Sequence, residues 1–494
     1  MRRRSFIKNS IATLLILRRP TLADLNFSPD SALPQSGSKS LTAQVAGFVV
    51  DSRFEDIPAA AIEAAKKSIL DGLGVALAGS RSVPASLIEK YITHESQGIR
   101  EASIFGSRAK TSAHFAALAN GIAMHADDFD DTYVANSNGI GVHPTVTVLP
   151  AVMAIAEKES FTGKSVLRSY LIGTEIEMRL AECVVLSSNE SPSHPSGTFG
   201  AIGSVAACAA LRGFGVEQTE QALGVGAGMA SGLRANFGSM SKPFAAGHAA
   251  ENGIVASDLV ALGWTGSDRI LESPLGFLAR EGSTYRPELL TAHLGNPWMF
   301  IDPGVAIKPY PSGALTHPAM SEMLRLIGKH KIKLEDVEYV NASTSQAVFN
   351  TLQYHRPNSG LQAKFSLEFC ISLILLQGRA GIADFSDLMV QREEVQRTIL
   401  KVRYLPFPEH QKTQDPIHTK LAIVLRDGRT LSGEASIPKG SPQLPMTFEE
   451  ASEKFKSCTD YAGWPADKSR EIVETVAAIE HLQSIRPLTS LLSL

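Results

Sequence analysis

Residues 194–207 read HPSGTFGAIGSVAA, and the glycines at positions 197, 200 and 203 stand three apart. Glycine costs roughly 1 kcal/mol in a helix interior, so its repeated use indicates a buried helix that packs closely against its neighbours. Small residues along one stripe allow two helix backbones to approach each other. The stretch therefore predicts a compact, all-helical core.

Helical spacing continues on both sides of this stretch. Ile62, Ala65, Ile69, Leu73 and Leu77 recur at intervals of three and four, as on one face of an amphipathic helix. We expect a large helical domain over residues 41–304. Its further apolar runs lie at 112–125, 144–157, 164–184, 197–213 and 248–262.

The pattern changes between residues 305 and 439. Three β-rich runs appear here, and Asp427-Gly428 supplies a hairpin turn after the last of them. The tail, residues 440–494, returns to helical spacing. We therefore predict a predominantly α fold, in which a smaller α/β (α+β) lid domain is inserted into the large helical domain. The β-rich runs are 337–343, 399–405 and 421–425, and helical runs lie at 317–327 and 365–377.

Composition limits the class of protein. A chain of 494 residues exceeds one ordinary core, and a net charge of −3 gives no reason to expect nucleic acid or an anionic membrane as a partner. The four cysteines lie far apart without a C-x-x-C motif, which argues against a zinc ribbon or an iron–sulfur cluster. We expect no metal and no cofactor, so side chains must carry the chemistry.

The N-terminus has features of an export signal. Residues 3–8, RRSFIK, resemble the core of a twin-arginine signal, and the apolar run 11–17 is far shorter than the roughly 20 residues of a membrane span. Residues 21–23 offer a cleavage site, but Arg18 and Arg19 interrupt the apolar region. We expect a twin-arginine-like signal and linker over residues 1–40 and a periplasmic protein; the alternative is a basic leader on a cytoplasmic one.

The densest polar cluster is HADDFDDT, residues 125–132, which follows the predicted helix 112–124. Four carboxylates within five residues repel one another, so their pKa values should be perturbed if they are buried. Phe129 within the run indicates partial burial. The alternatives are a solvated helix end or a calcium loop, although the EF-hand spacing is missing.

Three further stretches carry candidate residues. His194 precedes a glycine-spaced helix whose N-terminal N–H groups could receive a carboxylate, although such a histidine can also be structural. Lys242-Pro243 is either a functional lysine or an ordinary loop. Lys308 opens the predicted lid domain at a proline-rich stretch, and His317 follows it. Residues 224–232, GVGAGMASG, do not fit a dinucleotide-binding loop.

Five motifs together resemble the MmgE/PrpD family, which includes 2-methylcitrate dehydratase and cis-aconitate decarboxylase. They occur in the family's order, and the resemblance spans residues 42 to 490. It implies a large helical domain, a smaller α/β lid, a homodimer and a lyase that acts on a small carboxylic acid. The motifs are HADDFDDT, HPT, HPSGTFGAIGSVAA, SKPFAAGHAAENG and KPYPSGALTH.

The resemblance also implies an active site. His143, oriented by Asp128, is the expected base that takes a proton next to a carboxylate. Tyr354 or a second histidine, His194, would protonate a leaving hydroxyl. The substrate-binding residues that the resemblance implies are Thr132, Lys242 and Lys308, and the two lysines would also stabilise an enediolate. We add His317, which follows Lys308 in the sequence, to the expected substrate-binding residues.

One position departs from the cis-aconitate decarboxylase branch, where a histidine stands in place of Gly313. We therefore expect a cofactor-independent hydro-lyase, similar to 2-methylcitrate dehydratase, that acts on a di- or tricarboxylate. The alternatives are a decarboxylase or an epimerase on a related acid, or a carboxylate-binding protein without activity on the same fold.

Overall fold

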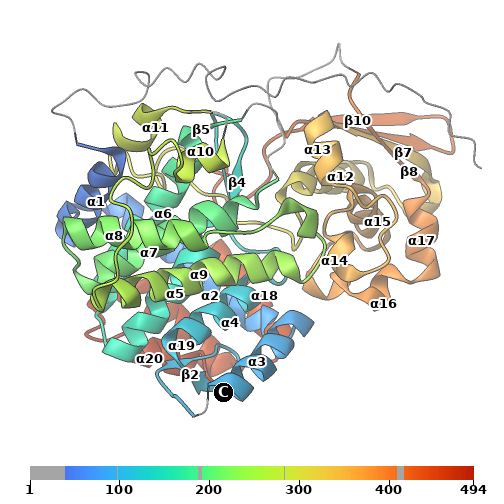
Figure 1. Ribbon diagram of the computed structural model, residues 1–494. Helices are drawn as coiled ribbons and strands as arrows, with labels where there is room; N and C mark the ends of the chain where they lie inside the picture. The colour runs from blue at the N-terminus through green and yellow to red at the C-terminus, as the bar shows by residue number, and fades with distance from the viewer. Residues whose placement is uncertain (1–38, 97, 187–191, 283, 409–416) are drawn as a thin grey trace, which may run out of the picture. The chain divides into compact units, whose positions relative to one another are not determined.

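Helices dominate the computed structural model, which describes residues 39–96, 98–186, 192–282, 284–408 and 417–494 (Figure 1). The twin-arginine-like segment lies outside the described residues. The predicted predominantly α fold with a smaller α/β region is confirmed. The helices before residue 300 are α1 (Leu41–Asp51), α2 (Ala59–Gly79), α3 (Val83–Glu95), α4 (Ala113–His125), α5 (Pro144–Glu159), α6 (Gly163–Cys183), α7 (Pro195–Arg212), α8 (Val216–Met229), α9 (Ser241–Ala261), α10 (Phe277–Glu281) and α11 (Pro287–Thr291).

Helices α4, α5, α7 and α9 pack together at the centre of this helical region. Glycines permit their close approach: a Cβ atom on Gly121 of α4 would lie 2.7 Å from the Cα of Gly247 in α9. A Cβ on Gly200 of α7 would lie 2.5 Å from the Thr147 side chain in α5. The glycine spacing in the sequence therefore reflects close helix packing, as expected.

The same packing brings four helix ends together. His125 is the last residue of α4, His143 is the N-cap of α5, His194 is the N-cap of α7, and Lys242 lies in the first turn of α9. Residues from four separate stretches of sequence thus meet at one place.

Among the described residues of the helical region, three short two-stranded ladders lie in the loops. Each pairs antiparallel. They join β1 (Ala102–Ser103) with β2 (Lys110–Thr111), β3 (Tyr133–Val134) with β4 (Gly141–Val142), and β5 (Val184–Val185) with β6 (Thr284–Tyr285).

The α/β part, residues 317–435, contains a four-stranded sheet in the order β10-β9-β7-β8. β7 (Val337–Thr344) is parallel to β8 (Val402–Pro406) and antiparallel to β9 (Thr419–Leu425), which forms a hairpin with β10 (Thr430–Ala435). The predicted turn is present, with Gly428 at a φ of +88°. The predicted strand 399–405 starts three residues too early, because Ile399 ends helix α17 (Glu393–Ile399).

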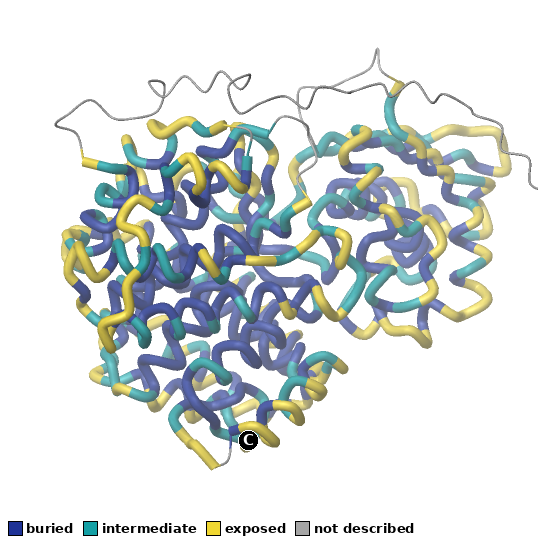
Figure 2. The backbone as a smooth tube through the Cα atoms, in the orientation of Figure 1, coloured by how far each residue is buried: buried dark blue, intermediate teal, exposed yellow. Residues whose placement is uncertain are grey.

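Helices α12 (His317–His330) and α15 (Leu367–Gln377) pack against this sheet. Their buried apolar side chains and those of the strands form a hydrophobic core separate from that of the helical region. In Figure 2 the buried segments of the helical region and of the α/β part are dark blue. Short helices α13 (Gln346–Thr351), α14 (Gly360–Ala363) and α16 (Asp387–Val390) complete the α/β part.

Two connecting segments join the α/β part to the helical region: the outgoing segment, residues 305–316, and the returning segment, residues 436–447. Thr132 and Ala306 form a pair of backbone hydrogen bonds of 2.8 and 2.9 Å, and the Ile307 amide donates to the Gly440 carbonyl at 2.9 Å. The outgoing and returning segments therefore lie side by side.

Beyond the returning segment, α18 (Phe448–Ala462) packs against α2, followed by α19 (Ala466–Ala477) and α20 (Arg486–Leu491). The tail thus rejoins the helical region. Within the described residues, none of the helices combines the length and apolar character that crossing a bilayer would need.

Candidate active site

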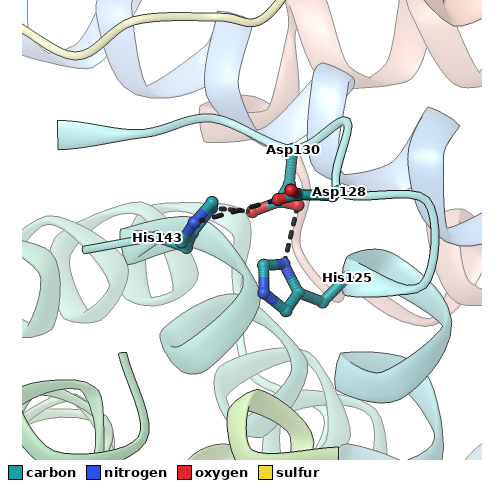
Figure 3. Close-up of side chains that lie close together, drawn as sticks. All are labelled: His125, Asp128, Asp130 and His143. Carbon is teal, nitrogen blue, oxygen red and sulfur yellow. Dashed lines mark hydrogen bonds and ion pairs between the residues drawn. The ribbon is translucent and has the colours of Figure 1, made fainter. Parts of the chain in front are cut away.

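Asp130 lies between the end of α4 and the start of α5, where it binds a histidine of each. It belongs to the acidic loop, residues 126–132, and is fully buried. Its two oxygens accept hydrogen bonds from Nδ1 of His125 at 2.8 Å and from Nδ1 of His143 at 2.6 Å (Figure 3). Because an ionised carboxylate can only accept, both imidazoles carry a proton on Nδ1.

The Nε2 atoms of these two histidines have different surroundings. Lys242 Nζ lies 2.7 Å from His125 Nε2, which therefore accepts from the ammonium group. His143 Nε2 has Asp128 Oδ1 at 4.0 Å, beyond hydrogen-bond distance. The His143 side chain is 12% exposed, whereas that of His125 is fully buried. His143 Nε2 is thus the nitrogen with a lone pair available to a substrate.

The electrostatic surroundings keep His143 neutral. Burial lowers its pKa to about 3; Asp130 opposes this shift, and the nearby Lys308 ammonium, His125 and Lys242 reinforce it. Burial likewise lowers the pKa of His125. A neutral imidazole can accept a proton, so His143 has the protonation state that a general base needs.

Asp128 lies between two buried lysines. Its Oδ1 atom accepts from Lys308 Nζ at 2.7 Å and from Lys242 Nζ at 3.0 Å. Burial alone would raise the pKa of Asp128, but the two ammonium groups hold it well below its usual value. This trio carries one net positive charge in a buried position, which favours an anionic ligand.

His194 and two phenylalanines border the same cluster. The His194 ring lies 6.3 Å from that of His125 and meets Phe237 edge-on at 5.2 Å. Lys242 Nζ lies 5.4 Å and 5.6 Å from the rings of Phe237 and Phe365. Burial and the charge of Lys242 lower the pKa of His194 well below its usual value. Among the described residues, the His194 ring nitrogens have no hydrogen-bond partner.

The remaining predicted residues lie around this cluster. Thr132 is buried, with its hydroxyl 3.5 Å from His143 Nδ1. His317 Nε2 lies 3.1 Å from the Ser312 carbonyl, to which it donates, and burial lowers its pKa to about 3. Tyr354 is half-buried and donates its hydroxyl proton to the Phe237 carbonyl at 2.8 Å. Tyr354 therefore reaches the cluster through Phe237, and its proton is already in use.

One predicted role is corrected. Asp128 was expected to orient His143, but Asp130 does so, and Asp128 instead binds Lys242 and Lys308. Neither Asp130 nor His125 is among the site residues predicted from the sequence. Both lie in the HADDFDDT cluster, which was the signal for them, but four neighbouring carboxylates give no indication of which one faces a histidine.

The cluster also has ligand types that a metal ion uses: one donor atom from each of His125, Asp128, Asp130 and His143 lies within 4.8 Å of the others. These atoms are poorly suited to a cation. Asp130 already binds both histidines, and two ammonium groups contact Asp128. A divalent ion would meet their positive charge at close range. The arrangement is better matched to a carboxylate.

Similarity to known proteins extends over this whole arrangement. A model of the MmgE/PrpD N-terminal domain matches residues 43–289, and a model of the MmgE/PrpD C-terminal domain matches residues 310–479. The cis-aconitate decarboxylase of Homo sapiens is 26% identical over 467 residues, which cover 92% of this chain and 95% of that protein. The cis-aconitate decarboxylase of Aspergillus terreus is 26% identical over 488 residues, with 93% and 97% covered.

Proposed function

Because this chain belongs to the MmgE/PrpD family, we propose that it is a lyase that removes a proton next to a carboxylate of a small di- or tricarboxylic acid. The observation that carries the proposal is that two aspartates of the acidic loop bind different kinds of partner. Asp130 binds two neutral histidines, and Asp128 binds two ammonium groups a few ångströms away. A base and a cationic site for the substrate thus lie next to each other.

In the first step, His143 Nε2 takes the proton from the carbon that bears the carboxylate. The C–H electron pair moves into the carboxylate, which becomes an enediolate. Lys242 and Lys308 stabilise its added negative charge, and a well-placed donor of this kind contributes roughly 3 kcal/mol. The substrate's own negative charge raises the pKa of His143 from about 3, which strengthens the base once the substrate is bound.

In the second step of a dehydration, the enediolate electrons form the double bond as the neighbouring C–O bond breaks. The departing hydroxide needs a proton to leave as water. We assign this proton to the His143 imidazolium formed in the first step, because His194, whose pKa burial holds well below its usual value, is neutral. The His194 ring borders the cluster and can form a hydrogen bond to the leaving hydroxyl. Hydro-lyase activity, as in 2-methylcitrate dehydratase, is therefore our leading proposal.

Decarboxylation is the second candidate, and the similar proteins favour it, since those from Homo sapiens and Aspergillus terreus are cis-aconitate decarboxylases. Against it stands Gly313, where that branch has a histidine. The backbone at Gly313 does not require glycine: its φ is −55°, and a Cβ atom would meet its nearest neighbour at 3.4 Å. Gly313→His should therefore fold, and under the leading proposal it should gain CO2 release that the unaltered protein lacks.

The test is incubation of the purified protein with 2-methylcitrate, citrate and cis-aconitate. New double bonds are followed by absorbance, CO2 by capture, and stereochemistry by chiral chromatography. His143→Ala should lose turnover by about 10²–10⁴-fold while keeping most of the substrate affinity. A protein that binds these acids but turns over none of them would instead be a carboxylate-binding protein.

The proposal also includes independence from metals. Turnover should survive exhaustive chelation, because Lys242 and Lys308 occupy the place where a cation would act. Loss of turnover on chelation, restored by one divalent ion, would assign the cluster at His125 and Asp130 to metal binding.

A further inference from the structure

Three successive backbone carbonyls of the acidic loop each accept a hydrogen bond from a buried lysine. Lys364 Nζ donates to the Asp127 carbonyl at 2.8 Å, Lys308 Nζ to the Asp128 carbonyl at 2.9 Å, and Lys454 Nζ to the Phe129 carbonyl at 2.6 Å. All three lysines are at most 8% exposed. We refer to Lys308, Lys364 and Lys454 as the lysine cradle.

The cradle draws on three separate segments of the chain. Lys364 follows α14 in the α/β part, Lys308 lies in the outgoing connecting segment, and Lys454 lies in α18 of the tail. None of them belongs to the helices whose ends form the site. The loop between α4 and β3 is thus held from outside by parts of the molecule that come later in the chain.

Each lysine has a second contact that fixes its position. Lys364 Nζ lies 3.3 Å from Asp127 Oδ1, and Lys454 Nζ lies 2.6 Å from Asp71 Oδ1 and 3.9 Å from the centre of the Phe129 ring. Lys308 also binds the Asp128 carboxylate. The ammonium groups are therefore anchored at both the loop backbone and a carboxylate.

The loop needs such support. Asp128 has a φ of +50°, a left-handed conformation that costs energy for any residue with a Cβ. Two residues later, Asp130 must reach both His125 and His143. A loop that relaxed at Asp128 would carry the Asp130 carboxylate away from the histidines.

We propose that Lys364 and Lys454 are positioning residues that hold the acidic loop in its active shape, so that docking of the α/β part completes the Asp130–His143 pair. The inference rests on the proposed function for the role of His143 as the base. Lys364 links the α/β part to the acidic loop, because it belongs to the α/β part and binds the Asp127 carbonyl of the loop. Without the α/β part in this position, the Asp127 carbonyl would lack the Lys364 ammonium as its partner.

The test compares Lys364→Met with a matched control, Lys401→Met. Lys401 is also a lysine of the α/β part that donates to a backbone carbonyl, that of Val337, but it does not contact the acidic loop. Amide hydrogen exchange over residues 126–132 should become at least about tenfold faster in Lys364→Met and stay unchanged in Lys401→Met. Unchanged exchange in a folded Lys364→Met protein would overturn the proposal.

Kinetics give the second readout. Lys364→Met should lower kcat by about 10²-fold with KM changed little, because Lys364 positions the base and does not bind substrate. Lys364→Arg, which keeps a cationic donor, should recover part of kcat. Equal losses in Lys364→Met and Lys401→Met would reduce Lys364 to a structural residue and contradict the proposal.

Hydrogen exchange needs no substrate, so its result does not depend on the proposed function. A protein that turns over no polycarboxylate removes the lyase assignment and leaves the exchange comparison intact. If Lys364→Met fails to fold, hydrogen exchange of the unaltered protein provides the test. The opening free energy of residues 126–132 should equal that of residues 360–366, because the loop depends on Lys364 in that segment. A loop more strongly protected than that segment would show that it does not depend on Lys364.

Discussion

Asp130 fixes the tautomers of two histidines at once, because its carboxylate accepts from Nδ1 of both His125 and His143. In Asp130→Asn, the amide can donate to Nδ1 and so favour the other tautomer of His143. The proton would then occupy Nε2, where the base needs a lone pair. We expect turnover to fall by about 10³-fold or more, with the fold retained.

The control for this variant is Asp258→Asn, since Asp258 is partly exposed, pairs with Arg212 and contacts neither histidine. Its effect on turnover should be small by comparison. Equal losses in steady-state kinetics of the two variants would mean that Asp130 has no special role.

The pH dependence follows from His143. Its neutral form is the active base, and burial lowers its pKa to about 3 in the unliganded protein. At pH 5 a histidine of ordinary pKa would be almost fully protonated, whereas this one remains neutral. After correction for ionisation of the substrate, kcat/KM should therefore stay level through pH 5 and fall only near pH 3.

The kcat profile should fall at a higher pH than kcat/KM, because bound carboxylates raise the pKa of His143. Both profiles come from initial rates over a pH series. An acid limb near pH 6.5 in kcat/KM would show that His143 is not the base or is not desolvated.

At the level of single residues, the sequence indicated the acidic cluster, His143, His194, Lys242 and Lys308, and the structure brings them together. It could not indicate which carboxylate faces the histidines. That depends on the backbone of the loop, which has a left-handed conformation at Asp128 that no residue type in the run requires.

At the level of elements, long helices were the most predictable features, because their apolar faces repeat over many turns. The predicted run 144–157 became α5 (Pro144–Glu159) almost unchanged. The start of α9 was missed, since Lys242-Pro243 suggested a loop. Proline is accepted in the first turn of a helix, where its missing N–H would have no partner, and Pro243 occupies that turn.

The glycine crossings between helices give a stability prediction. A Cβ atom on Gly203 of α7 would lie 2.6 Å from the Gly173 carbonyl oxygen of α6, which is backbone and cannot rotate away. Gly203→Ala should therefore lower the free energy of unfolding by about 1–3 kcal/mol. Urea denaturation followed by circular dichroism measures this change.

Gly228→Ala is the matched control. Gly228 also lies in a helix, α8, but its Cβ would meet nothing within 4 Å. This variant should be neutral or more stable by up to about 1 kcal/mol, from helix propensity alone. Equal destabilisation of both variants would mean that close packing at Gly203 is not the cause.

At the level of the whole molecule, the resemblance implies a homodimer. We expect light scattering after size exclusion to give about twice the chain's 52.9 kDa over a range of concentrations. A mass equal to one chain at micromolar concentration would contradict this expectation.

The joined connecting segments have a consequence for how such molecules diversify. Since the Ile307 amide binds the Gly440 carbonyl, the chain leaves the helical region and returns to it at nearly the same point. When the two ends of an insertion are adjacent, the chain entropy lost in closing it increases only slowly with its length. The α/β part between these ends can therefore become longer or shorter, or be replaced by another domain, during evolution. Any replacement must still provide a lysine that binds the Asp127 carbonyl.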